Sequence, residues 1–214
     1  MSNTTTQPKC NTPPFERKNN IKKVILEGNI GAGKTTILNK INTSFNKQFE
    51  PVEEFTLLAS FYADPVKYAM PLQVQVIEVH LDKESKLTQS TIFERSGESS
   101  VYIFGSILLD DKLLSTTQFN ELEEYLKQSY MVSGFIYVDV DVDKCMERIK
   151  LRGREGEEKI TRQYLEKLKA KIDKMYEHYT AMGIPCLRVE NKDDELTTNI
   201  TSIENFLENL NSDN

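Results

Sequence analysis

Short apolar runs alternate with amphipathic stretches along most of the chain. The runs are rich in β-branched residues, which is typical of buried strands, whereas the stretches between them repeat apolar residues at helical spacing. Strands are predicted at 22–27, 48–50, 90–94, 134–140 and 185–189, and helices at 33–47, 54–62, 66–86, 97–109, 117–131, 143–151, 161–181 and 195–210, with Asp143 as an N-cap. This alternation predicts an α/β fold with a parallel, five-stranded sheet covered by helices on both faces.

The residues between the first strand and the first helix form a complete phosphate-binding motif. They read Gly-Asn-Ile-Gly-Ala-Gly-Lys-Thr and match G-x-x-x-x-G-K-[ST]. The glycines let backbone N–H groups curve around a phosphate at the positive end of the following helix, while the lysine contacts phosphates and the threonine hydroxyl can ligate Mg²⁺. The predicted triphosphate-binding residues here are Gly28, Asn29, Ile30, Gly31, Ala32, Gly33, Lys34, Thr35 and Thr36.

Two acidic residues end predicted strands on the same side of the sheet as this loop. Glu50 precedes Pro51, which keeps its backbone extended, and Glu94 is followed by Arg95. Taken alone, a residue such as Glu50 is usually part of a loop, and a residue such as Glu94 is usually one partner of a surface ion pair. Ligands of parallel α/β sheets bind beyond the carboxyl ends of the strands, and a carboxylate there is expected near Mg²⁺. We therefore expect both residues near the phosphate loop.

An arginine-dense stretch with two glycines covers residues 148–159. Such a run is usually a solvated helix end. The functional alternative is a hinged flap whose arginines lie over the phosphates, because phosphoryl transfer spreads negative charge over the equatorial oxygens.

Composition limits the partners and the compartment. A chain of 214 residues fits one domain, predicted at 21–214, after a polar segment at 1–20 that is expected to be a disordered tail. The net charge of −6 disfavours a nucleic-acid partner, and no apolar run reaches membrane-spanning length. The three scattered cysteines favour a reducing compartment, so a cytoplasmic location is expected; Arg17 alone gives little support for a mitochondrial leader.

A phosphate loop alone does not separate kinases from GTPases. Residues 191–194 match the guanine-binding motif N-K-x-D, but no D-x-x-G occurs in the chain, which disfavours a GTPase. We interpret 190–194 as a polar loop after the last strand, near the purine of the triphosphate.

Several motifs together resemble the deoxynucleoside kinases. In order they are the phosphate loop, Glu50-Pro51-Val52, Tyr62-Ala63-Asp64-Pro65, Ala69-Met70-Pro71-Leu72-Gln73, Glu94-Arg95-Ser96 and R-x-x-x-R-x-R-x-x-E over 148–157. This family includes deoxycytidine, deoxyguanosine and mitochondrial thymidine kinases and related insect and viral enzymes. The resemblance covers 22–192 and implies a P-loop kinase fold with an Arg-rich lid, in which ATP phosphorylates the 5′-hydroxyl of a deoxyribonucleoside for nucleotide salvage.

The resemblance also implies a role for each matched residue. Glu50 would accept the proton of the 5′-hydroxyl, and Arg95 would hold that oxygen. The remaining assignments are Thr35 and Glu94 for Mg²⁺; Lys34, Arg148, Arg152 and Arg154 for the transferring phosphoryl group; Tyr62 and Glu157 for the 3′-hydroxyl; Gln73 for the base edge; and Phe104 for stacking on the base. From periodicity alone, Phe104 fits core packing equally well.

Departures from the family pattern affect which nucleoside base the protein is expected to prefer. Phe55 replaces the usual tryptophan and keeps an aromatic wall, while Ser100 and Val101 stand where relatives carry aspartate or alanine followed by arginine. Val76 and His80 occupy the matching pocket positions on helix 66–86, although His80 also fits a purely structural role. A small serine without a carboxylate favours a pyrimidine, thymidine included.

Two other functions share part of this pattern, and the sequence also raises the question of a dimer. A thymidylate-type kinase shares the loop and lid but needs extra cations for its acceptor's phosphate, which Glu50 and Glu157 would repel. A nucleotide-binding regulatory protein would not need a base beside the acceptor. The resemblance further implies a homodimer through helices 97–109 and 161–181, whose apolar faces could instead be buried within one monomer.

Overall fold

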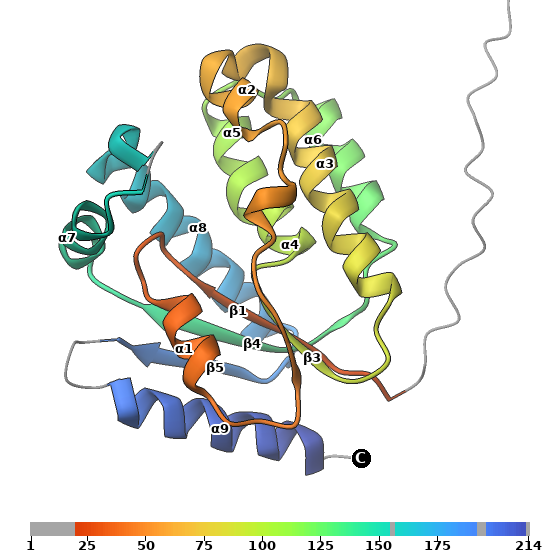
Figure 1. The fold of residues 1–214 in the computed structure, drawn as a ribbon. Coiled ribbons are helices and arrows are strands. Elements are labelled where there is room, and N and C mark those ends of the chain that lie inside the picture. Colours follow the sequence, from red (N-terminus) through yellow and green to blue (C-terminus); the bar gives the residue numbers. More distant parts are fainter. Residues whose placement is uncertain (1–19, 155–156, 192–195, 213–214) are drawn as a thin grey trace, which may run out of the picture.

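The computed structural model describes residues 20–154, 157–191 and 196–212. The expected tail at 1–20 lies outside them except for Asn20, and so do residues 192–194 of the predicted polar loop. Within the described part, five parallel strands form one sheet in the order β2-β3-β1-β4-β5 (Figure 1). Their bounds are β1 Lys23–Gly28, β2 Asn46–Gln48, β3 Thr91–Glu94, β4 Val132–Asp139 and β5 Cys186–Glu190. The predicted parallel α/β sheet is confirmed.

The central position of β1 determines where the chemistry lies. All six of its residues are buried, and it pairs with β3 on one side and β4 on the other. The register places Leu26 beside Glu94 and Gly28 beside Val138. The phosphate loop therefore begins next to the end of β3, in agreement with the rule that ligands of parallel sheets bind beyond the carboxyl ends of the strands.

Helices cover both faces of the sheet (Figure 1). Helices α1 (Lys34–Lys40) and α9 (Leu196–Ser212) pack on one face and α8 (Arg162–Ala181) on the other. Helices α2 (Leu58–Ala63), α3 (Pro65–Ser85) and α6 (Thr116–Leu126) stand beside them, and α7 (Val142–Arg152) precedes the single turn η3 (Glu157–Lys159). None of the helices in the described ranges is both long and apolar enough to cross a membrane.

Five predicted helices, including 97–109, differ from the observed ones in their ends, their caps or their regularity. Helix 33–47 ends at Lys40, because the chain turns back there to form β2 beside β3. Helix 54–62 splits into the turn η1 (Val52–Glu54) and α2. In the segment between them, Leu57 N donates to Gln75 Oε1 and Gln75 Nε2 donates to Thr56 Oγ1. Helix 117–131 ends at Leu126. The N-cap of α7 is Asp141, which accepts from Asp143 N, and not Asp143 itself.

The predicted helix 97–109 contains an irregular segment. It consists of α4 (Gly97–Ser99), a π-helical turn η2 (Ser100–Gly105) and α5 (Ser106–Asp110). A π turn adds a residue to the helical repeat and is common at functional sites. Here Ser100 and Phe104 line a cavity.

The apolar faces expected to form a dimer are buried within this monomer. Val101, Ile107 and Leu108 lie in the core, and so do the inward positions of α8, namely Leu165, Leu168, Ile172, Met175 and Tyr179. Their burial is explained by packing inside one chain, so the homodimer stays a prediction.

A group of charged residues that the sequence pattern did not reveal is buried at the start of β1. Lys23 Nζ donates to Glu84 Oε1 (2.5 Å), to both oxygens of Glu98 (2.8 and 2.7 Å) and to Ser129 Oγ (2.6 Å). Ser129 Oγ and Tyr130 N both donate to Glu84 Oε2. These bonds hold residues 129–130 outside helix α6. We call Lys23, Glu84, Glu98 and Ser129 the buried cluster.

Candidate active site

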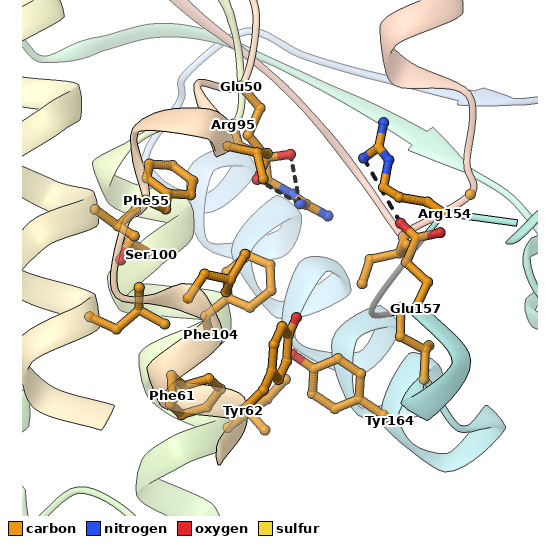
Figure 2. Close-up of a pocket in the computed structure, with 18 of the residues that line it drawn as sticks. Glu50, Phe55, Phe61, Tyr62, Arg95, Ser100, Phe104, Arg154, Glu157 and Tyr164 are labelled. Carbon is orange, nitrogen blue, oxygen red and sulfur yellow. Dashed lines mark hydrogen bonds and ion pairs between the residues drawn. The ribbon is translucent and has the colours of Figure 1, made fainter. Parts of the chain in front are cut away.

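A cavity of about 790 Å³ opens at the carboxyl ends of β1, β2 and β3 (Figure 2). Its lining includes the phosphate loop at one end, Glu50 and Arg95 in the middle, and α3 and η2 at the other end. Residues from α7, η3 and α8 close a further side. The sheet thus brings together motifs that are far apart in the sequence.

The phosphate loop has the conformation that its glycines were expected to allow. Gly31 and Gly33 have φ of 80° and 91°, the left-handed region that other residues rarely adopt. A Cβ on Gly31 would lie 2.7 Å from the Cys145 carbonyl oxygen. The loop is also supported from outside, since Asn191 Nδ2 donates to Ala32 O (2.7 Å) and Asn29 Nδ2 donates to Leu165 O (2.9 Å). This supporting role of Asn191 was not predicted, because the only sequence signal at that position was the misleading N-K-x-D match.

Arg148 belongs to the floor of this loop. Its Nη1 lies 3.4 Å from both Gly31 O and Ala32 O, and Nη2 donates to Asn191 O (3.1 Å). It also lines the cavity, as do Arg152 and Arg154.

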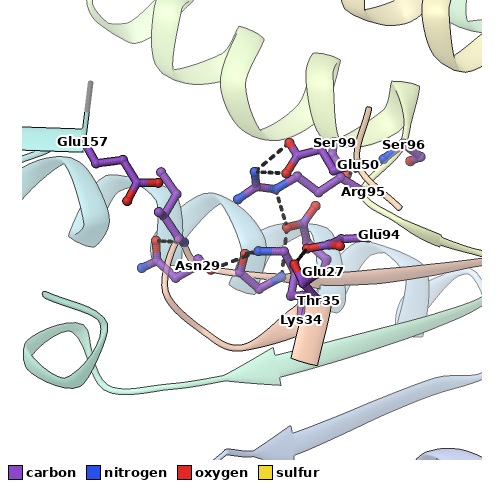
Figure 3. A network of polar contacts seen from close by, with 12 residues as sticks. Glu27, Asn29, Lys34, Thr35, Glu50, Glu94, Arg95, Ser96, Ser99 and Glu157 are labelled. Carbon is purple, nitrogen blue, oxygen red and sulfur yellow. Dashed lines mark hydrogen bonds and ion pairs between the residues drawn. The ribbon is translucent and has the colours of Figure 1, made fainter. Parts of the chain in front are cut away.

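Lys34 is buried at the base of the loop. Its Nζ donates to Gly28 O (2.9 Å) and Asn29 O (3.0 Å), and Figure 3 shows Lys34 close to Glu27 and Thr35. Burial, and then the positive charge of Arg95, lower its pKa to about 8. Negatively charged phosphates in the loop would favour the protonated form.

Thr35 and Glu94, the two residues expected to hold Mg²⁺, are in contact with each other. Thr35 Oγ1 donates to Glu94 Oε1 at 2.6 Å, and both residues line the cavity. Within the described ranges no cluster of three His, Cys, Asp or Glu could hold a metal. A hydroxyl and one carboxylate nevertheless fit Mg²⁺, which is usually held by few protein oxygens together with phosphates and water.

Glu50 and Arg95 form the central ion pair (Figures 2 and 3). Arg95 Nη1 donates to both carboxylate oxygens of Glu50, at 2.8 and 3.0 Å. Arg95 has a φ of 61° just after β3, and its guanidinium lies 5.0 Å from the ring centre of Phe104. Burial alone would raise the pKa of Glu50, but Arg95 and Lys34 outweigh it and hold that pKa below its ordinary value. Glu50 is therefore anionic at neutral pH.

The far end of the cavity is mostly apolar and carries one amide and one hydroxyl among its lining residues. Gln73 is buried and accepts a hydrogen bond from Ser100 Oγ at 2.6 Å, and Phe55, Val76 and Phe104 line the same region. This arrangement fixes the orientation of the Gln73 side chain. Its Nε2 remains as a donor, and the carbonyl oxygen keeps a second lone pair.

His80 does not line this cavity, contrary to the expectation that it contacts the base. It is buried with its ring centre 6.2 Å from that of Phe55, and its Nδ1 has no hydrogen-bond partner among the described residues. Burial, and then the charge of Lys23, lower its pKa to about 4. The position of His80 favours the structural alternative.

The lid side of the cavity carries the arginine-rich segment and two tyrosines. Arg152 pairs with Glu157 (3.1 and 2.5 Å), and Arg154 lies 3.9 Å from the same carboxylate. Tyr62 lies across the cavity from Glu157, with Tyr164 beside it (Figure 2). Burial raises the pKa of Tyr164 to about 12, so its hydroxyl stays protonated. The sequence pattern placed Tyr164 only in a helix, since one tyrosine in an amphipathic stretch is no sign of a site.

Together these groups can bind a chain of phosphates at one end and a flat polar ring at the other. Between them a carboxylate and a guanidinium are placed to act on an alcohol.

The comparisons with known proteins agree with this geometry. A family model described as deoxynucleoside kinase matches residues 24–212. A putative kinase of Invertebrate iridescent virus 6 is 32% identical over 86% of this chain and 97% of its own length. A probable deoxycytidine kinase of Fowlpox virus is 32% identical over 72% of this chain and 71% of its own. The structure of deoxyadenosine kinase from M. mycoides with bound dCTP has a TM-score of 0.73 at 25% identity, covering 87% of this chain and 99% of that one.

Proposed function

Because the chain belongs to the deoxynucleoside kinase family, we propose that it transfers the γ-phosphoryl group of ATP to the 5′-hydroxyl of a pyrimidine deoxyribonucleoside. The observation that carries this proposal is the Glu50–Arg95 pair, which lies between the phosphate loop and the Gln73 pocket. Relatives named as deoxycytidine and deoxyadenosine kinases support the nucleoside as acceptor but differ in their base.

The donor end supports binding of the triphosphate. Backbone N–H groups of the loop and Lys34 would hold the β- and γ-phosphates. Arg152 and Arg154 are on the lid side of the cavity, where their charge would stabilise the equatorial oxygens of the transferring group. Both are paired with Glu157 here, so phosphate would compete with that carboxylate for them.

The central pair would act on the alcohol. A 5′-hydroxyl is a poor nucleophile, so its placement must contribute much of the acceleration. As the 5′-oxygen bonds to the γ-phosphorus and the bond to the ADP oxygen breaks, the hydroxyl proton would pass to Glu50. A carboxylate of low pKa can serve because the transition state is loose and the proton moves late. Arg95 Nη2, which has no hydrogen-bond partner among the described residues, would hold the 5′-oxygen.

Thr35 and Glu94 would hold Mg²⁺ beside the phosphates. When bound, this ion supplies positive charge to the β- and γ-oxygens.

Sugar and base would occupy the remaining length of the cavity. Tyr62 and Glu157 face each other across it and would bond the 3′-hydroxyl (Figure 2). Gln73 would pair with the base edge between Phe55 and Phe104, with Val76 alongside. Ser100 is uncharged and engaged with Gln73, so an amide and an aromatic wall, without an ionic network, would select the base. This favours a pyrimidine.

The charges of the acceptor region disfavour a thymidylate-type kinase. A nucleotide acceptor brings a second phosphate, which Glu50 and Glu157 would repel.

ADP release with five acceptors offered separately tests the proposal. Thymidine and deoxycytidine should give the highest kcat/KM, deoxyadenosine and deoxyguanosine lower values, and thymidylate none. Activity only with thymidylate would refute nucleoside phosphorylation, and a purine preference would refute the assignment of the base alone.

A further inference from the structure

A third carboxylate, Glu27, contacts Arg95 of the central ion pair and lies outside every motif considered above. It is buried within β1, immediately before the phosphate loop. Its Oε1 accepts from Gly28 N at 2.8 Å and from Arg95 Nε at 3.3 Å (Figure 3). One oxygen atom thus joins the first amide of the phosphate loop to the guanidinium at the acceptor site.

The two carboxylates hold Arg95 by different atoms. Glu50 takes only Nη1, Glu27 takes only Nε, and the guanidinium face rests near Phe104. These contacts leave Nη2 directed into the cavity (Figure 2). Since a guanidinium is planar, fixing two of its nitrogen atoms also fixes the third.

We propose that Glu27 is a positioning residue, which keeps Arg95 aligned with the phosphate loop while Glu50 takes up the proton of the nucleoside. This inference rests on the proposed function, because it assigns the proton to Glu50.

The need for a second anion follows from the reaction itself. Before transfer, Glu50 is negative and holds Arg95 by a charge-assisted contact through both of its oxygens. Once Glu50 has accepted the proton, late in the reaction, it is neutral, and that contact is weakened while Arg95 still has to hold the 5′-oxygen. Glu27 receives no proton in this scheme. It remains as an anionic partner of Arg95 throughout the turnover.

The unpartnered oxygen of Glu27 fits this role. Its Oε2 is buried and makes no hydrogen bond to any described residue. An unsatisfied buried carboxylate oxygen destabilises the fold, because the group has lost its hydration without gaining a partner. A glutamine at this position could keep the oxygen that bonds Gly28 and Arg95 while removing the charge.

The test compares Glu27→Gln with Glu27→Ala in the full-length protein. Glu27→Gln should lower kcat about 10- to 100-fold, the range expected when a reacting group is slightly misplaced, with the KM for ATP and nucleoside changed less than about threefold. Glu27→Ala also removes the acceptor of Gly28 N, so it should additionally weaken ATP binding, and Glu27→Gln should rescue that affinity.

A double-mutant cycle shows whether Glu27 acts through Arg95. Arg95→Lys keeps a positive charge but has no Nε, so adding Glu27→Gln to it should lower kcat less than about threefold further. Glu84→Gln is the matched control, because it makes the same change in a buried carboxylate outside the site. It should lower the free energy of unfolding and leave kcat within about twofold.

The outcomes separate this inference from the proposed function. A wild-type protein that phosphorylates no nucleoside overturns the function. The role of Glu27 alone is overturned if the wild type is active and Glu27→Gln keeps full kcat. It is also overturned if Glu27→Gln lowers kcat by the same factor in the Arg95→Lys background as in the wild type.

Discussion

Two groups of charged side chains lie at opposite ends of β1, and they differ in how completely they are satisfied. In the buried cluster, Lys23 Nζ has four acceptor oxygen atoms on three side chains and does not line the cavity. In the catalytic cluster, defined as Glu27, Lys34, Glu50, Glu94 and Arg95, Arg95 Nη2 and Glu27 Oε2 have no hydrogen-bond partner among the described residues.

This difference separates a structural from a functional use of charge. Buried polar groups are normally paired, so an unpaired one that opens on a cavity indicates a missing ligand. The burial of a charged group does not by itself indicate a missing ligand. Lys23 is more deeply buried than Arg95, yet it has no role in the proposed chemistry.

The largest expected effect is on catalysis, from Glu50→Gln. The amide cannot accept the hydroxyl proton, so kcat should fall by about 10²- to 10⁴-fold, the usual contribution of a general base. The Kd for ATP should stay within about threefold, because Glu50 lies beyond the phosphate loop. Steady-state kinetics and ATP titration measure the two effects. Turnover within a few-fold of wild type would place the catalytic base elsewhere and remove the contrast between the clusters.

Lys23→Met should produce the matching effect on stability. It leaves two buried carboxylates without their cation, which should lower the free energy of unfolding by about 3–5 kcal/mol in urea titrations. Without Lys23, burial raises the carboxylate pKa values of the folded state above those of the unfolded state. Part of the lost stability should therefore return as the pH falls from 7 to 5. The kcat of the folded fraction should stay within about threefold; a loss like that of Glu50→Gln would make this cluster catalytic as well.

Ser100 of the cavity and Ser129 of the buried cluster allow a smaller, sharper comparison. Ser100→Ala removes the donor to Gln73, which should raise the KM for the preferred nucleoside about 3- to 10-fold, the usual value of a hydrogen bond, with little change in unfolding. Ser129→Ala should do the reverse, lowering the free energy of unfolding without changing KM. If both variants change the same quantity, the two hydroxyls do not have separate functions.

The sequence predicted the catalytic cluster better than the buried one, for a physical reason. The phosphate loop, Glu50 and Glu94-Arg95 stand at strand ends, and the rule for parallel sheets brings such positions together whatever their separation in sequence. Lys23 and Glu84 occupy ordinary positions in a strand and a helix, where charged residues are usually at the surface. They are buried where the Lys23 side chain meets Glu84 of α3 and Glu98 of α4, and a linear pattern does not contain that tertiary contact.

The same limit explains the other differences. His80 matched a pocket position of the family by spacing, but its side chain is buried near the Phe55 ring and does not line the cavity. Glu27 could not be found because a single acidic residue at the end of an apolar strand has no distinctive spacing. Positions at strand ends predicted which residues meet at the cavity, whereas helical spacing did not predict which way the His80 side chain points.

The smallest expected effect is a pH dependence that both clusters share. Burial alone would raise the pKa of Glu50 and of Glu98, yet a neighbouring cation lowers it in each case, Arg95 for the first and Lys23 for the second. Because the proposed role of Glu50 requires its anionic form, kcat/KM should decline only as the pH falls through its lowered pKa. Between pH 7 and pH 5 the decline due to Glu50 should therefore stay below about twofold. Steady-state kinetics with circular dichroism at each pH separates this titration from acid unfolding. A fall in kcat/KM centred near pH 6, with the fold intact, would mean that Arg95 does not control the charge of Glu50.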